Sequence, residues 1–284
     1  MSTPSPRQIL ETLLPPLRAA AAYARFIQPK ITALPVKEGD NFFAQALSDA
    51  DLSIQNMVEV VLLGTFPDIR FYGEELDRSP NTKYFRSTEL GPPGDYLVTL
   101  DPIDGTKFYL DGHSNYQILL GVLNADEFEA ALAISPGEDS YFYAFRGEGV
   151  FKGSLNVNFD QCTPLKIQPL KSAILLGVGM SHLKSRLGDR YTAVDVEMDY
   201  SSDRQIPNIN GMFGGDLCGA AIRAGKFIDG ALLAFMAKEA GCIVTTSDGS
   251  PLPPLHACED YSRPGLIVAA SEAIHRDLLA ACGG

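Results

Sequence analysis

Residues 96–108 constrain what this chain can fold into more than any other segment. An apolar, β-prone run at 96–100 ends abruptly in the sequence Asp-Pro-Ile-Asp-Gly-Thr at 101–106. Pro102 fixes its own φ and favours an extended conformation at Asp101, so we expect a strand that stops there. Ligands of open α/β sheets usually bind beyond the carboxyl ends of strands. The segment therefore predicts a strand followed by a polar turn at the edge where ligands bind.

The two carboxylates of this turn, Asp101 and Asp104, are three residues apart. Carboxylates that point to one place repel unless a cation lies between them, and hard divalent cations prefer oxygen ligands. If Gly105 and Thr106 begin a helical turn, their N–H groups offer an anion site beside the metal. A metal next to an oxyanion site indicates phosphate chemistry. An ordinary surface turn is the alternative, because Asp, Pro and Gly are common turn residues.

Three more motifs accompany this turn. Gly73-Glu74-Glu75 follows a short apolar run at 69–72, residues 144–153 have the glycine spacing of a tight hairpin, and Asp229 precedes Glu239-Ala240-Gly241. In this order the motifs resemble those of the inositol monophosphatase family of metal-dependent, lithium-sensitive phosphatases, whose signature is Asp-Pro-Ile/Leu-Asp-Gly-Thr after Gly-Glu-Glu. The resemblance spans residues 37–252. It implies an α/β fold, the layered αβαβα sandwich of this family.

The resemblance also implies a site with two or three Mg²⁺ ions. Glu74, Asp101 and the carbonyl of Ile103 correspond to the ligands of the first ion. Asp101, Asp104 and Asp229 correspond to those of the second, so that Asp101 bridges the two. A metal pair of this kind activates a water molecule and stabilises the leaving oxygen of a phosphomonoester.

Catalytic and phosphate-binding roles follow from the same resemblance. Thr106 orients the attacking water with support from Glu74, and Asp104 and the backbone of Gly105 and Thr106 bind phosphate. Ser48-x-x-Asp51 resembles the family's Thr-x-x-Asp, whose aspartate hydrogen-bonds the threonine. For Glu75 the sequence leaves two interpretations open, a remote contact to a metal or water and an exposed loop acid.

Asp229 has two compatible interpretations. It begins a predicted helix at 229–240, where an aspartate caps the first turn, and it matches the spacing of the third metal aspartate. The tryptophan that precedes this aspartate in the family is Ile228 here, and the segment before it is altered. Asp229 and Gly230 can therefore also correspond to a neighbouring Asp-Gly of the family that does not bind metal.

The substrate is less constrained than the reaction. The family glutamate that contacts inositol hydroxyls corresponds to Ile222, which precedes two cations, Arg223 and Lys226. Either cation can meet a second phosphate or be solvated. Lys107 follows Asp-Gly-Thr, and a lysine at this position resembles the branch of the family that hydrolyses 3′-phosphoadenosine 5′-phosphate. We expect inositol monophosphate as substrate, with a bisphosphate nucleotide or sugar bisphosphate as the alternative.

Two other classes deserve comparison. Haloacid-dehalogenase phosphatases also carry Asp-Gly-Thr, but their nucleophilic aspartate lies two residues before the second one, without the spacing and Pro102 found here. A non-catalytic metal-binding relative would not need the complete set Glu74, Asp101, Asp104 and Thr106.

Composition bounds the partners. The 284 residues carry a net charge of −12, which argues against nucleic-acid binding through a basic field. We see no membrane span or secretion signal, so we expect a cytoplasmic protein, and the resemblance is compatible with a homodimer. We expect an N-terminal α+β half at 1–160 that carries the metal loop, and a C-terminal α/β half at 161–284 that closes the active-site cleft.

Hydrophobic periodicity predicts the elements. Helices are expected at 7–28, interrupted or kinked by Pro15-Pro16, and at 49–64. Strands are expected at 69–72 and 96–100, separated by a polar loop at 77–95, and then as a four-strand meander between 116 and 152 and a strand at 173–178. The helix at 229–240 is apolar nearly all round, which predicts that it is buried.

Overall fold

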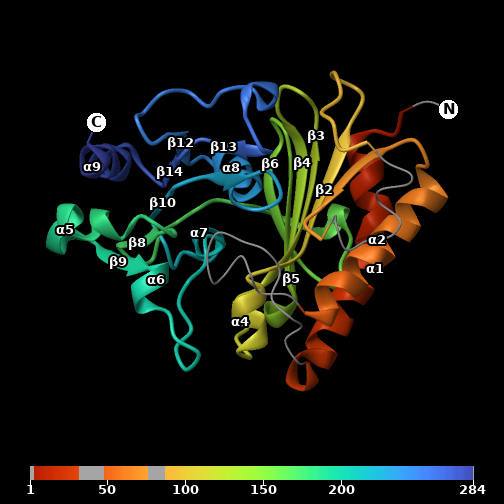
Figure 1. The fold of residues 1–284 in the computed structure, drawn as a ribbon, viewed down its shortest axis with the longest axis horizontal. Coiled ribbons are helices and arrows are strands. Elements are labelled where there is room, and N and C mark those ends of the chain that lie inside the picture. The colour runs from red at the N-terminus through yellow and green to blue at the C-terminus, as the bar shows by residue number, and fades with distance from the viewer. Residues whose placement is uncertain (1–2, 32–47, 76–86, 284) are drawn as a thin grey trace. The chain divides into compact units, whose positions relative to one another are not determined.

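The computed structural model describes residues 3–31, 48–75 and 87–283 (Figure 1). Part of the predicted polar loop, 77–86, and the first part of the motif-bearing segment, 37–47, lie outside these residues. The chain forms two compact units, Met1–Phe145 with Phe151–Thr163, and Arg146–Val150 with Pro164–Gly284.

The first unit contains β1 to β5 and most of β6 from a seven-stranded sheet, whose spatial order follows the chain order. β1 pairs with β2 in parallel, whereas the pairs β2–β3, β3–β4 and β4–β5 are antiparallel. The predicted strand at 69–72 and the predicted meander are present. The strands are β1 (Arg70–Gly73), β2 (Leu97–Asp104), β3 (Gln117–Leu123), β4 (Phe128–Ser135), β5 (Ser140–Phe145), β6 (Gly149–Ser154) and β7 (Thr163–Leu165).

Helices α1 (Pro6–Ile27) and α2 (Asp49–Thr65) cover one face of this sheet (Figure 1). Alternate strand residues, such as Leu100 of β2 and Leu120 of β3, pack with the apolar stripes of both helices in one buried core. This alternation distinguishes the two faces. Residues on the helix-covered face build the core, and their neighbours along each strand point to the other face.

The predicted interruption of the first helix is wrong. α1 continues through Pro15 and Pro16 as one helix. Each proline deprives the carbonyl four residues earlier of its donor, but Glu11 is exposed and Thr12 half-buried, so water can reach that side of the helix. The buried leucines on either side of the prolines anchor the helix across the defect.

The second unit contains a five-stranded sheet in the order β12-β14-β10-β8-β9 and a small two-stranded sheet, β11-β13. β9, β8 and β10 run parallel to one another, whereas β14 runs antiparallel to its two neighbours, β10 and β12. The strands are β8 (Ala173–Leu176), β9 (Thr192–Asp195), β10 (Gly219–Ile222), β11 (Gly225–Lys226), β12 (Ile243–Thr246), β13 (Ser262–Arg263) and β14 (Leu266–Ala269).

Helices lie on both faces of the five-stranded sheet. Leu278 of α9 (Glu272–Cys282) and Leu187 of α5 (Lys184–Leu187) pack with Ile174, Ala221 and Ile267 on one face. Alternate residues of β10 and β14 point to the other face, where α8 (Gly230–Glu239) contacts β12 and β14. Every α8 residue from Ala231 to Ala237 is buried, which confirms the predicted burial of this helix. Among the described residues, short α-helices also occur as α4 (Thr106–Leu110) in the first unit and as α6 (Val196–Asp199) and α7 (Gly211–Gly214) in the second.

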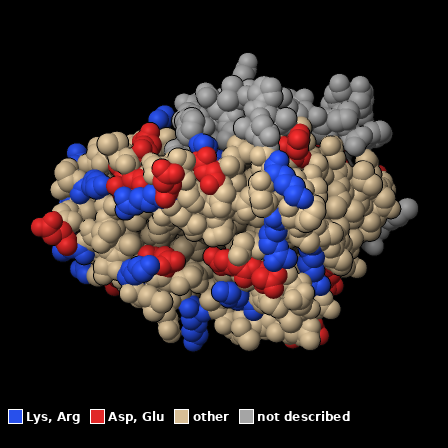
Figure 2. All heavy atoms as spheres, turned by 90° about the horizontal axis from the view of Figure 1, so that it is seen from below, with Lys and Arg blue, Asp and Glu red and all other residues tan. Residues whose placement is uncertain are grey.

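Three further properties concern the surface of the molecule and its cysteines. Among the described residues, no helix has the length and apolarity needed to cross a bilayer. On the face drawn in Figure 2, basic and acidic side chains lie interspersed rather than gathered into one basic field. All five cysteines are free thiols.

Candidate active site

A β-bulge positions the two aspartates of the Asp-Pro-Ile-Asp turn. The predicted end of the strand at Asp101 is wrong, because β2 continues to Asp104. Asp101 is opposite Leu119 of β3, whereas Asp104 is opposite Gln117, so three steps along β2 match two steps along β3. The extra residue is a bulge, one of the few places where a sheet tolerates a proline such as Pro102.

The bulge places both carboxylates on the same face of the sheet. Leu119 and Gln117 are two residues apart in β3 and therefore share a face, and residues directly opposite each other point the same way. Asp101 and Asp104 thus lie on the face away from α1 and α2, while Ile103 between them is buried in the core beneath those helices. Without the extra residue, Asp101 and Asp104 would point to opposite faces.

Glu74 directly follows β1 and lies at the same end of the sheet as Asp101. Gly73 is paired with Leu100, and the N–H of Glu74 donates to the carbonyl of Leu100 at 2.9 Å, which extends the parallel ladder by one bond. In this register Glu74 lies beside Asp101. Glu74 is half-buried and Asp101 is 4% exposed, so these two predicted ligands lie at a sheltered edge rather than on an open surface.

The helical turn expected after Asp104 is present as α4. Gly105 precedes it with φ of +85°, a left-handed conformation that glycine adopts without the Cβ clash of other residues. A Cβ at this position would also lie 2.9 Å from Cδ2 of Phe108. The turn therefore depends on glycine for both its backbone conformation and its packing.

Thr106 is anchored from two sides. Its Oγ1 lies 2.9 Å from the carbonyl oxygen of Ile103 and 3.2 Å from Oδ1 of Asp51. The contact to Asp51 is the hydrogen bond that the family resemblance implies. Asp51 is fully buried near the start of α2, and its Oδ2 accepts hydrogen bonds from the backbone N–H of Ser48 at 2.8 Å and the hydroxyl of Ser48 at 2.5 Å.

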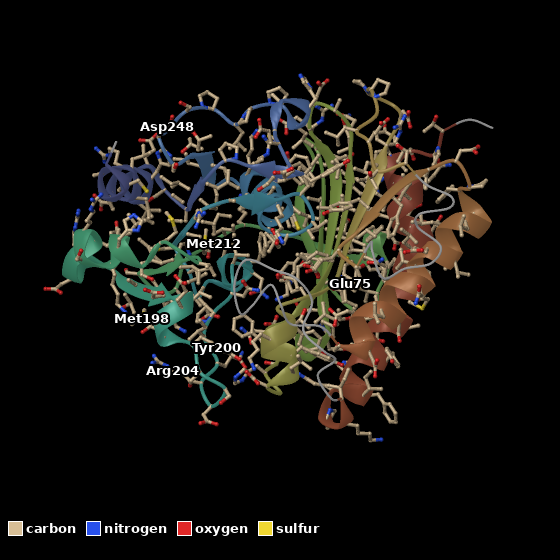
Figure 3. All side chains as sticks on the ribbon, in the orientation of Figure 1. Glu75, Met198, Tyr200, Arg204, Met212 and Asp248 are labelled. Carbon is tan, nitrogen blue, oxygen red and sulfur yellow. The ribbon has the colours of Figure 1, made fainter. Side chains whose placement is uncertain are left out.

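Glu75 is not an exposed loop acid. It is 2% exposed and lies at the end of β1 (Figure 3), where its N–H donates to Oε1 of Gln55 at 2.9 Å. Sequence reasoning missed Gln55, a buried residue of α2. The available signal was its position one helical turn after Asp51, on the same face of the helix.

The donor chemistry at this edge fits a hard divalent cation. Glu74, Asp101 and Asp104 are oxygen donors on neighbouring strands, and the carbonyl of Ile103 is close by. Within residues 3–31, 48–75 and 87–283, no three His, Cys, Asp or Glu side chains already converge in the arrangement of a metal site. The register brings the carboxylates to one edge of the sheet without closing them around a common point.

Lys107 has a partner of its own. Its Nζ lies 2.8 Å from Oδ1 of Asp111, one turn further along the chain, and both side chains are largely covered. Lys107, the residue that resembles the nucleotide-hydrolysing branch of the family, is therefore already paired with a carboxylate.

In the second unit, Asp229 is the N-cap of α8. Its side chain accepts a hydrogen bond from the N–H of Gly230, the first residue of the helix, which is compatible with the cap interpretation. Ile228, at the place of the family's tryptophan, is buried. Arg223 and Lys226 are exposed in the segment between β10 and α8, after the half-buried Ile222.

Glu239 at the other end of α8 has a structural role that sequence reasoning did not identify. Its Oε2 accepts hydrogen bonds from the backbone N–H groups of Gly147 at 2.9 Å and Gly149 at 3.3 Å. The Gly-x-Gly spacing of the predicted hairpin turn was the signal, since such turns expose backbone donors.

Comparison with known proteins identifies the family. Residues 17–282 match the family model of the inositol monophosphatase family, and the chain belongs to this family. Its members are metal-dependent phosphatases that hydrolyse phosphomonoesters, and the chain is therefore a phosphatase of this class. The inositol-1-monophosphatase ImpA of Mycolicibacterium smegmatis is 30% identical over 225 residues, which cover 76% of this chain and 73% of that protein.

Solved structures share the fold. An IMPase from Thermotoga maritima superposes with a TM-score of 0.70 at 18% identity, covering 96% of both chains. An IMPase/NADP phosphatase, solved in complex with Mg²⁺ and phosphate, superposes with a TM-score of 0.66 at 19% identity, covering 97% of this chain and 95% of that one. The α/β fold is that of the inositol monophosphatases, as the sequence motifs predicted.

Proposed function

We propose that this phosphatase uses Mg²⁺ to hydrolyse a small phosphorylated metabolite, with inositol monophosphate as the first expected substrate. The observation that carries the proposal is the bulge in β2, which brings Asp101 and Asp104 to one face of the sheet beside Glu74. Family membership, and the Mg²⁺ and phosphate bound by the structurally similar IMPase/NADP phosphatase, support the choice of metal.

The proposed ligands are the carboxylates at the ends of β1 and β2. Glu74, Asp101 and the carbonyl of Ile103 would hold one ion, and Asp101, Asp104 and Asp229 a second. Mg²⁺ bound there would lower the pKa of a water molecule and stabilise charge on the leaving oxygen. The proposal therefore makes Asp101, which is shared, the most sensitive position.

The chain's own groups would orient the water and the phosphate. The hydroxyl of Thr106 has one proton and donates to one acceptor at a time, Asp51 or the carbonyl of Ile103. Its lone pairs are then available to accept a hydrogen bond from the attacking water, with Glu74 as the second support. The backbone N–H groups of Gly105 and Thr106, together with Asp104, would contact the phosphate.

A bisphosphate nucleotide such as 3′-phosphoadenosine 5′-phosphate is the second candidate substrate. Arg223 and Lys226 favour it, because both are exposed cations after β10 and can meet a second phosphate. Ile222 favours it as well, because its apolar side chain cannot hydrogen-bond inositol hydroxyls. The ion pair of Lys107 with Asp111 removes one argument for it.

Phosphate release by the purified protein tests the proposal. Inositol 1-phosphate and 3′-phosphoadenosine 5′-phosphate are offered side by side with Mg²⁺, with and without lithium. Faster, lithium-sensitive turnover of the inositol ester is the expected result, and preference for the nucleotide selects the second candidate. No release from either substrate, or a covalent phosphoaspartate trapped during turnover, contradicts the proposed function or its water-attack mechanism.

A further inference from the structure

Helix α2 makes two contacts with the candidate site, one helical turn apart. Asp51 contacts Thr106, which follows β2, and Gln55 contacts the segment that follows β1. Both side chains are buried, Asp51 at 0% and Gln55 at 1% exposed. The contact of Asp51 follows the pattern expected for this family. The contact of Gln55 comes from the structure alone.

The amide of Gln55 is fixed by what its neighbours can donate and accept. The backbone N–H of Glu75 is only a donor, so the atom that faces it at 2.9 Å must be Oε1. Nε2 then donates to Oε1 of Glu59 at 3.1 Å, one turn further along α2. Both ends of the amide are therefore engaged, and its orientation is determined by the backbone at Glu75.

Gly73 shows how closely this amide approaches the strand. A Cβ on Gly73 would lie 2.3 Å from Oε1 of Gln55 and 2.4 Å from its Cδ. No side chain fits in this space, so the amide lies directly against the backbone of Gly73. Gln55 consequently contacts the residue before Glu74 and hydrogen-bonds the residue after it.

We propose that Gln55 is a positioning residue for Glu74, which fixes the backbone on both sides of this predicted metal ligand. The inference rests on the proposed function, in which Glu74 binds Mg²⁺. The N–H of Glu74 is held by the carbonyl of Leu100, and the N–H of Glu75 by Gln55, so successive backbone groups are tied to the sheet and to α2. Through Asp51 and Gln55, one helix sets both the end of β1 and the turn after β2.

Replacement of Gln55 by methionine tests this role, because methionine keeps nearly the same volume and loses the acceptor. We expect Gln55→Met to bind Mg²⁺ about tenfold more weakly, as is typical when a group that orients a metal ligand is removed. The measurement is isothermal titration calorimetry of the purified full-length protein with MgCl₂, which does not depend on turnover.

Asn124→Leu is the matched control. Asn124 is also a buried amide, and its Oδ1 accepts the backbone N–H groups of Asp126 at 2.8 Å and Glu127 at 3.1 Å. It follows Leu123, which pairs with Leu97 at the start of β2, whereas Asp104 lies at the end. We expect this variant to lose thermal stability and to keep the wild-type affinity for Mg²⁺.

The outcomes separate the two proposals. Wild-type Mg²⁺ affinity in Gln55→Met, or an equal loss in Asn124→Leu, overturns the role of Gln55 and leaves the proposed function intact. Absence of Mg²⁺ binding by the wild-type protein overturns the proposed function, and the inference with it. If Gln55→Met does not fold, Gln55→Asn serves instead, because its amide is one methylene too short to reach Glu75 while remaining polar, and the same tenfold loss is expected.

Discussion

The turn after β2 and the start of α8 both carry predicted metal ligands, but they are held in different ways. At the first, the hydroxyl of Thr106 is hydrogen-bonded to Asp51, 55 residues earlier in the chain, and the bulge in β2 is determined by its pairing with β3. At the second, the N–H of Asp229 donates to the carbonyl of Lys226 at 3.2 Å, and its own carbonyl accepts from Leu233 at 3.0 Å. Contacts distant in sequence shape the first, and a helix-capping turn shapes the second.

This difference determines how function and stability can be separated experimentally. In the first region, the groups that would bind metal are set by the packing of the sheet against α2, so only isosteric substitutions isolate chemistry from folding. In the second, capping is a local property of one residue, and Asn caps a helix about as well as Asp. The two regions therefore call for different variants.

The largest effect is expected at Asp101. Asp101→Asn keeps the shape of the side chain and removes the charge that would be shared by two ions. We expect phosphate release at saturating substrate and Mg²⁺ to fall by about 10³-fold, which corresponds to about 4 kcal/mol of transition-state stabilisation. Steady-state kinetics of the purified variant measures it.

Asp126→Asn is the control for this substitution, because Asp126 is an exposed aspartate in the turn between β3 and β4, away from Asp101. It should retain wild-type turnover. Wild-type rates from Asp101→Asn would refute the assignment of Asp101 as the shared ligand.

A smaller effect is expected at Thr106. Thr106→Val is isosteric and removes the hydroxyl that contacts Asp51 and the carbonyl of Ile103. Loss of a group that orients the attacking water should lower kcat by about 10²-fold, at the lower end of the range for positioned proton-transfer groups. Mg²⁺ affinity, measured by calorimetry, should change little.

Thr106→Ser is the companion variant, since it restores the hydroxyl and should recover most of the turnover. Equal kcat in the valine and wild-type proteins would show that Thr106 is only a structural anchor of α4.

The sequence was sufficient to predict elements that are defined by local patterns. The strand at 69–72, the meander, the buried helix at 229–240 and the helical turn at Gly105 were all predictable from periodicity and turn residues. The family and its fold followed from four motifs in order. These features are encoded within short segments, which is why residue type and spacing reveal them.

Features that depend on a distant partner were not predictable in the same way. The bulge at Pro102 depends on pairing, because β2 has one residue more than β3 between two paired positions, and a proline is equally compatible with the end of a strand. α1 continues through Pro15 and Pro16 because flanking leucines are buried against the sheet. Gln55 was missed because its partner is a backbone N–H, which residue type does not reveal, and only its position one turn after Asp51 indicated a role.

The smallest expected effect distinguishes the two interpretations of Asp229. Asp229→Asn keeps a capping side chain at the start of α8 and removes one proposed charge from the metal site. Asp229→Ala removes both, and loss of the cap should lower the free energy of unfolding by about 1 kcal/mol. If Asp229 is a metal ligand, both variants should bind Mg²⁺ about tenfold more weakly in calorimetry, while only the alanine variant loses stability in thermal unfolding. If Asp229 is only a cap, the asparagine variant should match the wild type in both measurements, and the second ion would then have to be held by Asp101 and Asp104 without it.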